Sequence, residues 1–81
     1  MKNKEDIFKI LQEIFDQIFI TEILICNELS ANDVEEWDSL MQISLIVAVE
    51  SRFDIRFALG EVENVENVGQ FAELILAHLE A

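Results

Sequence analysis

The chain has 81 residues, with 17 acidic and 5 basic side chains and a formal net charge of -12. A chain of this length holds one hydrophobic core, so we expect a single domain over residues 1–81. The charge repels polyanions and argues against a nucleic-acid partner. Because 52% of the residues are hydrophobic, we expect the chain to fold despite its self-repulsion.

One cysteine, Cys26, and one histidine, His78, provide no disulfide pair and no Cys/His cluster for zinc. We interpret Cys26 as a small buried apolar residue. The longest stretch without a charge, 39–49, is shorter than the roughly 18 to 20 residues that span a bilayer, and we expect no signal peptide. The sequence therefore predicts a cytoplasmic protein without a membrane span or a bound metal.

The scarcity of helix-breaking residues indicates an all-α fold, since the chain has no proline and only two glycines. The spacing predicts a first helix that starts near Lys4 and ends at about Ile25, with its tail buried on several sides. Its inward stripe has apolar residues three and four positions apart: Ile7, Ile10, Leu11, Ile14, Phe15 and Ile18. A long loop is expected over 27–38, where the apolar periodicity weakens.

A second helix is predicted from Asp38 or Ser39 to about Phe53, with Asp38 as its N-cap. A short turn of helix fits 60–65, and Asn67 suits the N-cap of a last helix. The inward stripe of this last helix comprises Val68, Phe71, Ala72, Leu74, Ile75 and Leu79. The resulting fold is a small bundle of three main helices and one short one.

The second helix has two apolar sectors when each residue turns it by about 100°. One sector comprises Leu45, Ile46, Val49 and Phe53, and the other comprises Leu40, Ile43 and Val47. A helix of a small bundle needs one buried stripe, so the second sector lines a cavity, meets another segment or faces a partner; the alternative is that both are core. Trp37, just before this helix, is expected to anchor the preceding loop on the bundle.

Ser39 lies between these two sectors, in the first turn of the second helix. The amide groups of a helix N-terminus favour an anion such as a phosphodiester, although a serine there most often only assists capping. The chain lacks Gly-x-Ser-x-Gly and any histidine at motif spacing, which argues against a hydrolase. Ser39 is therefore interpreted as a substrate for modification rather than as a catalytic nucleophile.

The segment Glu36-Trp37-Asp38-Ser39-Leu40, with the apolar spacing that follows it and Phe53-Asp54-Ile55, closely resembles the signature of acyl carrier proteins. The resemblance implies a four-helix bundle in which Ser39 receives phosphopantetheine from coenzyme A. It also implies a magnesium-dependent phosphopantetheinyl transferase that recognises Asp38 and Leu40. The arm's thiol would hold acyl groups as thioesters and present them to acyl-loading, acyl-transfer or synthase enzymes, in fatty acid or polyketide synthesis. Such a carrier is not an enzyme, and we expect a monomer.

The second helix departs from the family pattern, in which several acidic residues dock on basic patches of partner enzymes. Only Glu50 is acidic within it, and the other acids lie before Ser39 and after the helix. This distribution and Trp37 are more typical of carriers in specialised pathways, so we expect apolar as well as acidic docking. The residues expected to dock partners are Glu35, Glu36, Met41, Ile43, Val47, Glu50 and Glu61.

Two other functions stay open on the sequence alone. An aminoacyl or peptidyl carrier would use the same arm, and nothing in the sequence separates it from an acyl carrier. An unmodified acidic helical module for protein interaction would need only the charge and an apolar patch. A calcium-binding loop is excluded because no Asp-x-Asp-x-Asp-Gly run is present.

Overall fold

The computed structural model describes residues 3–58 and 60–80. This part of the chain forms three α-helices, α1 (Lys4–Ile18), α2 (Ser39–Phe53) and α3 (Val68–Glu80), and two turns of 3-10 helix, η1 (Ala31–Asp33) and η2 (Val62–Asn64). No strand occurs within it. The predicted all-α class is confirmed, and η2 is the short helix expected at 60–65. The turn η1 was not predicted.

Each α-helix begins at a polar cap. The Asn3 side chain accepts the Asp6 N–H in a capping box. The Asp38 carboxylate accepts the Met41 N–H at 2.9 Å, and the Asn67 side chain accepts the Gln70 N–H at 2.8 Å. These bonds satisfy first-turn amides that have no partner inside the helix. The predicted starts of all three helices are confirmed.

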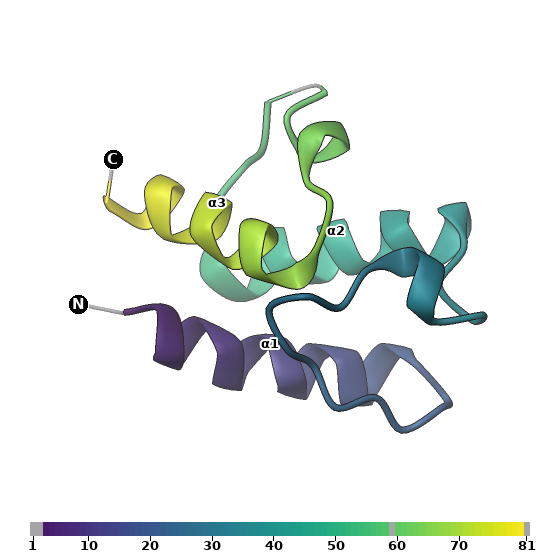
Figure 1. The fold of residues 1–81 in the computed structure, drawn as a ribbon. Coiled ribbons are helices and arrows are strands. Elements are labelled where there is room, and N and C mark those ends of the chain that lie inside the picture. Colours follow the sequence, from purple (N-terminus) through teal and green to yellow (C-terminus); the bar gives the residue numbers. More distant parts are fainter. Residues whose placement is uncertain (1–2, 59, 81) are drawn as a thin grey trace.

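The helix α1 lies against both other helices. α2 runs back antiparallel to α1, and the start of α1 and the end of α3 lie at the same end of the bundle (Figure 1). The start of α2 therefore lies at the other end, next to the connection that leaves α1.

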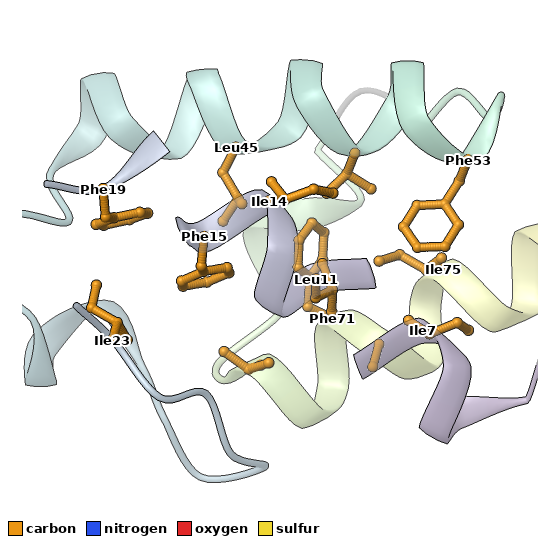
Figure 2. Close-up of a cluster of buried hydrophobic side chains, with 13 residues drawn as sticks. Ile7, Leu11, Ile14, Phe15, Phe19, Ile23, Leu45, Phe53, Phe71 and Ile75 are labelled. Atoms are coloured by element: carbon orange, nitrogen blue, oxygen red, sulfur yellow. The ribbon is translucent and has the colours of Figure 1, made fainter. Parts of the chain in front are cut away.

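The core fills the space between the three helices (Figure 2). Its buried members from α1 are Ile7, Leu11, Ile14 and Phe15, from α2 Leu45, Val49 and Phe53, and from α3 Val68, Phe71, Ala72 and Ile75. All of these residues belong to the predicted stripes, and their predicted burial is confirmed. The remaining members of the stripes are half-buried: Ile10, Ile18, Ile46, Leu74 and Leu79.

The predicted end of the first helix is wrong. α1 ends at Ile18, and Phe19 is already extended. The segment after it buries Phe19 and Ile23, whereas Ile20 is 97% and Leu24 is 87% exposed, so its apolar residues are not buried on several sides as expected. The long connection therefore begins at residue 19 and not at residue 27.

Two polar side chains replace the helical hydrogen bonds in this segment. The Glu36 carboxylate accepts the N–H groups of Ile20 and Thr21 at 2.9 and 3.0 Å. The Gln12 amide donates to Ile23 O at 2.7 Å and accepts the Ile25 N–H at 3.0 Å. Because backbone groups need partners, these side chains stabilise an extended path where the apolar pattern alone indicated helix.

Cys26 lies on this connection and is exposed, so the prediction of a buried Cys26 is wrong. The residues that follow it reach the start of α3, where Val68 N–H donates to Leu29 O and Gly69 N–H donates to Asn27 O. The connection thus caps α3 with its own carbonyl groups.

Candidate functional site

Ser39 is the first residue of α2, and its side chain is exposed. Asp38, just before it, holds the helix start through its side chain and also through its carbonyl, which accepts the Gln42 N–H at 2.9 Å. The sequence expectation that Ser39 occupies the first turn of a capped helix is confirmed. The hydroxyl is therefore accessible on a well-fixed turn.

A groove of about 550 Å³ opens beside Ser39, between the start of α2, the turn η2 and the start of α3. Its apolar walls come from Ile43, Val62, Val65 and Phe71. Phe71 is also a core residue, so one wall of the groove is part of the core. The other residues that line it are Ala31, Trp37, Asp38, Gln42, Glu63, Glu66 and Asn67.

Trp37 anchors the end of the long connection on the core. Its ring lies edge-on to Phe15 and Phe19, with centroid distances of 5.3 and 5.9 Å. Its Nε1–H donates to Gln42 Oε1 at 2.7 Å. The anchoring predicted for Trp37 is confirmed, and the Gln42 contact is an addition that the sequence did not indicate.

The second apolar sector of α2 faces solvent. Leu40 is 72% exposed, and Ile43 and Val47 are each 59% exposed, whereas Leu45 and Val49 are fully buried. Met41, which the sequence grouped with the docking residues, is half-buried and lies against the core. The solvent-facing stripe of α2 is therefore Leu40, Ile43 and Val47.

Three of the acids expected to dock partners are bonded within the chain. Glu36 accepts two backbone N–H groups, and Glu50 Oε2 accepts the Phe57 N–H at 3.0 Å. Glu61 Oε1 accepts the Ala58 N–H at 2.9 Å and lies 2.8 Å from His78 Nε2. Glu35 is exposed. No sequence signal reveals these bonds, because a carboxylate that accepts backbone N–H groups looks the same in sequence as a solvated one.

These bonds lower the pKa of two carboxyl groups. The N–H groups of Ile20 and then Thr21 hold the pKa of Glu36 below its ordinary 4.5. The N–H of Ala58 and then the hydrogen bond from His78 hold the pKa of Glu61 below the same value. In both cases the bonds favour the charged form.

The groove brings the Ser39 hydroxyl together with carboxylates. The described residues that line it include no histidine, lysine, arginine or cysteine. Its ionisable side chains are the carboxylates of Asp38, Glu63 and Glu66. In the described part of the chain, no three or more metal-ligating side chains gather, and no helix is long and apolar enough to cross a membrane.

No family model matches the sequence. Among solved structures, the chain is similar to the solution NMR structure of a holo acyl carrier protein from Geobacter metallireducens. The two sequences are 42% identical over 90% of this chain and 85% of the other, and the folds superpose with a TM-score of 0.83. The similarity thus concerns sequence and fold over nearly the whole length of both chains.

Proposed function

The chain belongs to the acyl carrier protein family, and from this we propose that Ser39 carries phosphopantetheine and that the protein holds acyl groups for partner enzymes. The observation that carries the proposal is the exposed Ser39 on the capped first turn of α2, beside a groove with apolar walls. The protein is a carrier in this proposal and catalyses no reaction itself.

The residues around Ser39 fit a phosphopantetheine group. The exposed hydroxyl leaves room for a phosphodiester, and the amide groups of the first helical turn favour its negative charge. Val62, Val65 and Phe71 offer apolar contact for an arm or an acyl chain that lies along the groove. When bound, the group supplies a terminal thiol on which an acyl group is held as a thioester.

Proteins of this family interact with transferase and synthase enzymes. For this chain we propose a phosphopantetheinyl transferase and acyl-loading, acyl-transfer or synthase enzymes, in the cytoplasm. The net charge of -12 favours encounter with basic partner surfaces and makes the encounter sensitive to salt. The stripe Leu40, Ile43 and Val47 supplies apolar contact at the same helix.

The stripe supports a partner whose docking surface is partly apolar. Exposed apolar side chains in a row on one helix are a common protein-interaction surface. Of the expected acidic contacts, Glu35 is exposed, while Glu36, Glu50 and Glu61 hold hydrogen bonds within the chain. Glu35 is therefore the most accessible of these four carboxylates to a partner cation.

A thiol assay tests the function. Because Cys26 is exposed and would react, the assay uses a Cys26→Ala background, which has no other cysteine. After incubation with coenzyme A, Mg²⁺ and a broad-specificity phosphopantetheinyl transferase, and after removal of free coenzyme A, we expect one reactive thiol per chain. The same protein with Ser39→Ala is the control and gains none.

A folded Cys26→Ala protein that gains no thiol with several transferases would contradict the proposal. The chain would then be an unmodified helical module for protein interaction, with Ser39 serving only the start of α2. A gained thiol that accepts aminoacyl groups but no acyl groups from the corresponding loading enzymes would change the cargo to that of an aminoacyl carrier.

A further inference from the structure

The hydrogen bond between Trp37 and Gln42 fixes the orientation of a side-chain amide beside Ser39. An indole N–H can only donate, so Gln42 must turn its oxygen toward Trp37, and the observed contact is Nε1 to Oε1 at 2.7 Å. The Nε2 of Gln42, with two N–H donors, therefore points away from the indole. Among the described residues, no side-chain hydrogen bond uses this nitrogen.

Gln42 and Ser39 lie on the same side of α2. Residues three apart are neighbours on a helix surface, and long helical side chains lean toward the N-terminus. Gln42 follows this rule, since it reaches back to Trp37, and both Gln42 and Ser39 line the groove. The oriented amide is thus within reach of a group attached to the Ser39 hydroxyl.

A phosphodiester at Ser39 would enter surroundings that are already negative. The groove has carboxylates at Asp38, Glu63 and Glu66, and the described residues that line it include no cationic side chain. The Asp38 carboxylate is turned to the helix amide of Met41. Because the described residues that line the groove include no cation, the side chains there that can bond the phosphodiester are neutral N–H donors, and a hydrogen bond to a charged oxygen is stronger than one between neutral groups. Gln42 is the lining residue of α2 that provides a side-chain N–H donor.

We propose that Trp37 and Gln42 form a positioning pair for the prosthetic arm, in which Gln42 Nε2 donates a hydrogen bond to a phosphodiester oxygen on Ser39. The inference rests on the proposed function. Trp37 contributes by holding the amide in the donating orientation from an anchored indole. The contact restrains the first bonds of the arm and directs it along the groove.

Side-chain NMR of the apo and holo proteins tests the pair. On conversion to the holo form we expect the Gln42 side-chain amide protons to move downfield, as they do when hydrogen-bonded to a charged oxygen. Gln17 is the matched control, since it is exposed on α1 and does not line the groove, and its side-chain amide protons should not move. Trp37→Phe keeps an aromatic ring but removes the N–H, and it should reduce the shift at Gln42.

A second measurement tests only whether the side chain at position 42 lies close to the phosphodiester on Ser39. In Gln42→Glu, the introduced carboxyl can still accept from Trp37, and the nearby phosphodiester should raise its pKa in the holo form relative to the apo form. The expected rise is about half a pH unit, which one unit charge exerts in water from about 6 Å. Gln17→Glu, at an exposed position of α1 outside the groove, should show no such difference between its two forms.

The possible results distinguish a failure of the positioning pair from a failure of the proposed carrier function. If mass spectrometry shows the arm on Ser39 but the Gln42 amide does not move, the positioning pair is wrong and the carrier function stands. If no arm is attached to a folded protein, both are wrong. The amide measurement uses the wild-type chain, so it decides between these outcomes even if a variant fails to fold.

Discussion

His78 Nε2 lies 2.8 Å from Glu61 Oε1, and this hydrogen bond joins the last turn of α3 to the segment just before η2. The His78 ring also lies edge-on to Phe57, with a centroid distance of 5.2 Å, and Phe57 contacts Phe71. Because Phe71 and η2 line the groove at Ser39, the far end of α3 supports one wall of the site.

The Glu61 carboxyl provides a direct readout of this contact. Removing the imidazole with His78→Ala should raise the pKa of Glu61 toward its ordinary 4.5, since His78 contributes one of the bonds that lower it. Carbon-13 NMR titration of the carboxyl groups measures the change, with the exposed Glu63 as an internal control. An unchanged pKa of Glu61 would mean that the contact does not persist in solution.

Glu36 should make stability depend on pH in the acid range. Its folded-state pKa is lowered, so its contribution is fully present above 4.5, where it is charged in both states, and is lost as the pH falls through the folded-state value. Glu36→Gln should therefore lower the urea concentration at the midpoint of unfolding at pH 7. The difference in this midpoint between Glu36→Gln and the wild type should become smaller below pH 4.5.

Glu35→Gln is the matched control for this experiment. Glu35 is exposed, and its carboxylate takes part in no side-chain hydrogen bond among the described residues, so the substitution removes the same charge without removing a bond. Both variants relieve the self-repulsion of a chain with net charge -12. If the two variants have the same midpoint at pH 7, the bonds from Glu36 to Ile20 and Thr21 contribute nothing to stability.

Gly69→Ala should destabilise the fold, although alanine normally favours a helix over glycine by about 1 kcal/mol. A Cβ at this position would lie 2.7 Å from Asn27 Oδ1 and 3.0 Å from Asn27 O. Since Asn27 O accepts the Gly69 N–H, the connection cannot retreat without loss of that bond. We expect a loss of roughly 1 to 3 kcal/mol in the free energy of unfolding, measured by urea denaturation.

Asn27→Gly tests the cause of that loss. It removes the side-chain atoms that face Gly69 and leaves only the backbone oxygen. The double variant should therefore lose less stability than the sum of the two single variants. If the stability loss of the double variant equals the sum of the two single losses, the close approach of Asn27 does not cause the destabilisation by Gly69→Ala.

The exposed stripe of α2 should contribute to transferase docking. Val47 is 59% exposed and does not line the groove at Ser39, so Val47→Glu changes the stripe but not the attachment site. We expect kcat/KM for modification by a phosphopantetheinyl transferase to fall by about tenfold, the effect of losing about 1.4 kcal/mol of contact. Gln17→Glu adds the same charge at an exposed position of α1 and should leave kcat/KM unchanged. Equal values for the two variants would contradict docking through the stripe.

The features that were predicted correctly depend on residues that are close together in the sequence. The caps at Asp38 and Asn67 need only neighbouring amides, and the inward stripes follow from helical periodicity. The path of residues 19–30 was not predictable in this way, because Gln12 and Glu36 fix it from 11 to 16 positions away. The exposure of Cys26 follows from that path.

The same distinction applies to the candidate site. The position of Ser39 at the start of α2 follows from the sequence pattern, which also separates Leu40, Ile43 and Val47 from the buried sector but leaves open whether both sectors are core. The bonds that engage the side chains of Glu50 and Glu61 do not, since they depend on how the connection after α2 folds back.

The most direct test of the carrier function is the intact mass of the protein after incubation with coenzyme A, Mg²⁺ and a phosphopantetheinyl transferase. Ser44→Ala is the matched control for Ser39→Ala, since both serines are exposed on α2. We expect one phosphopantetheinyl increment on the wild type and on Ser44→Ala, and none on Ser39→Ala. An increment that persists on Ser39→Ala, or its absence from a folded wild-type protein, would contradict the assignment of Ser39 as the attachment site.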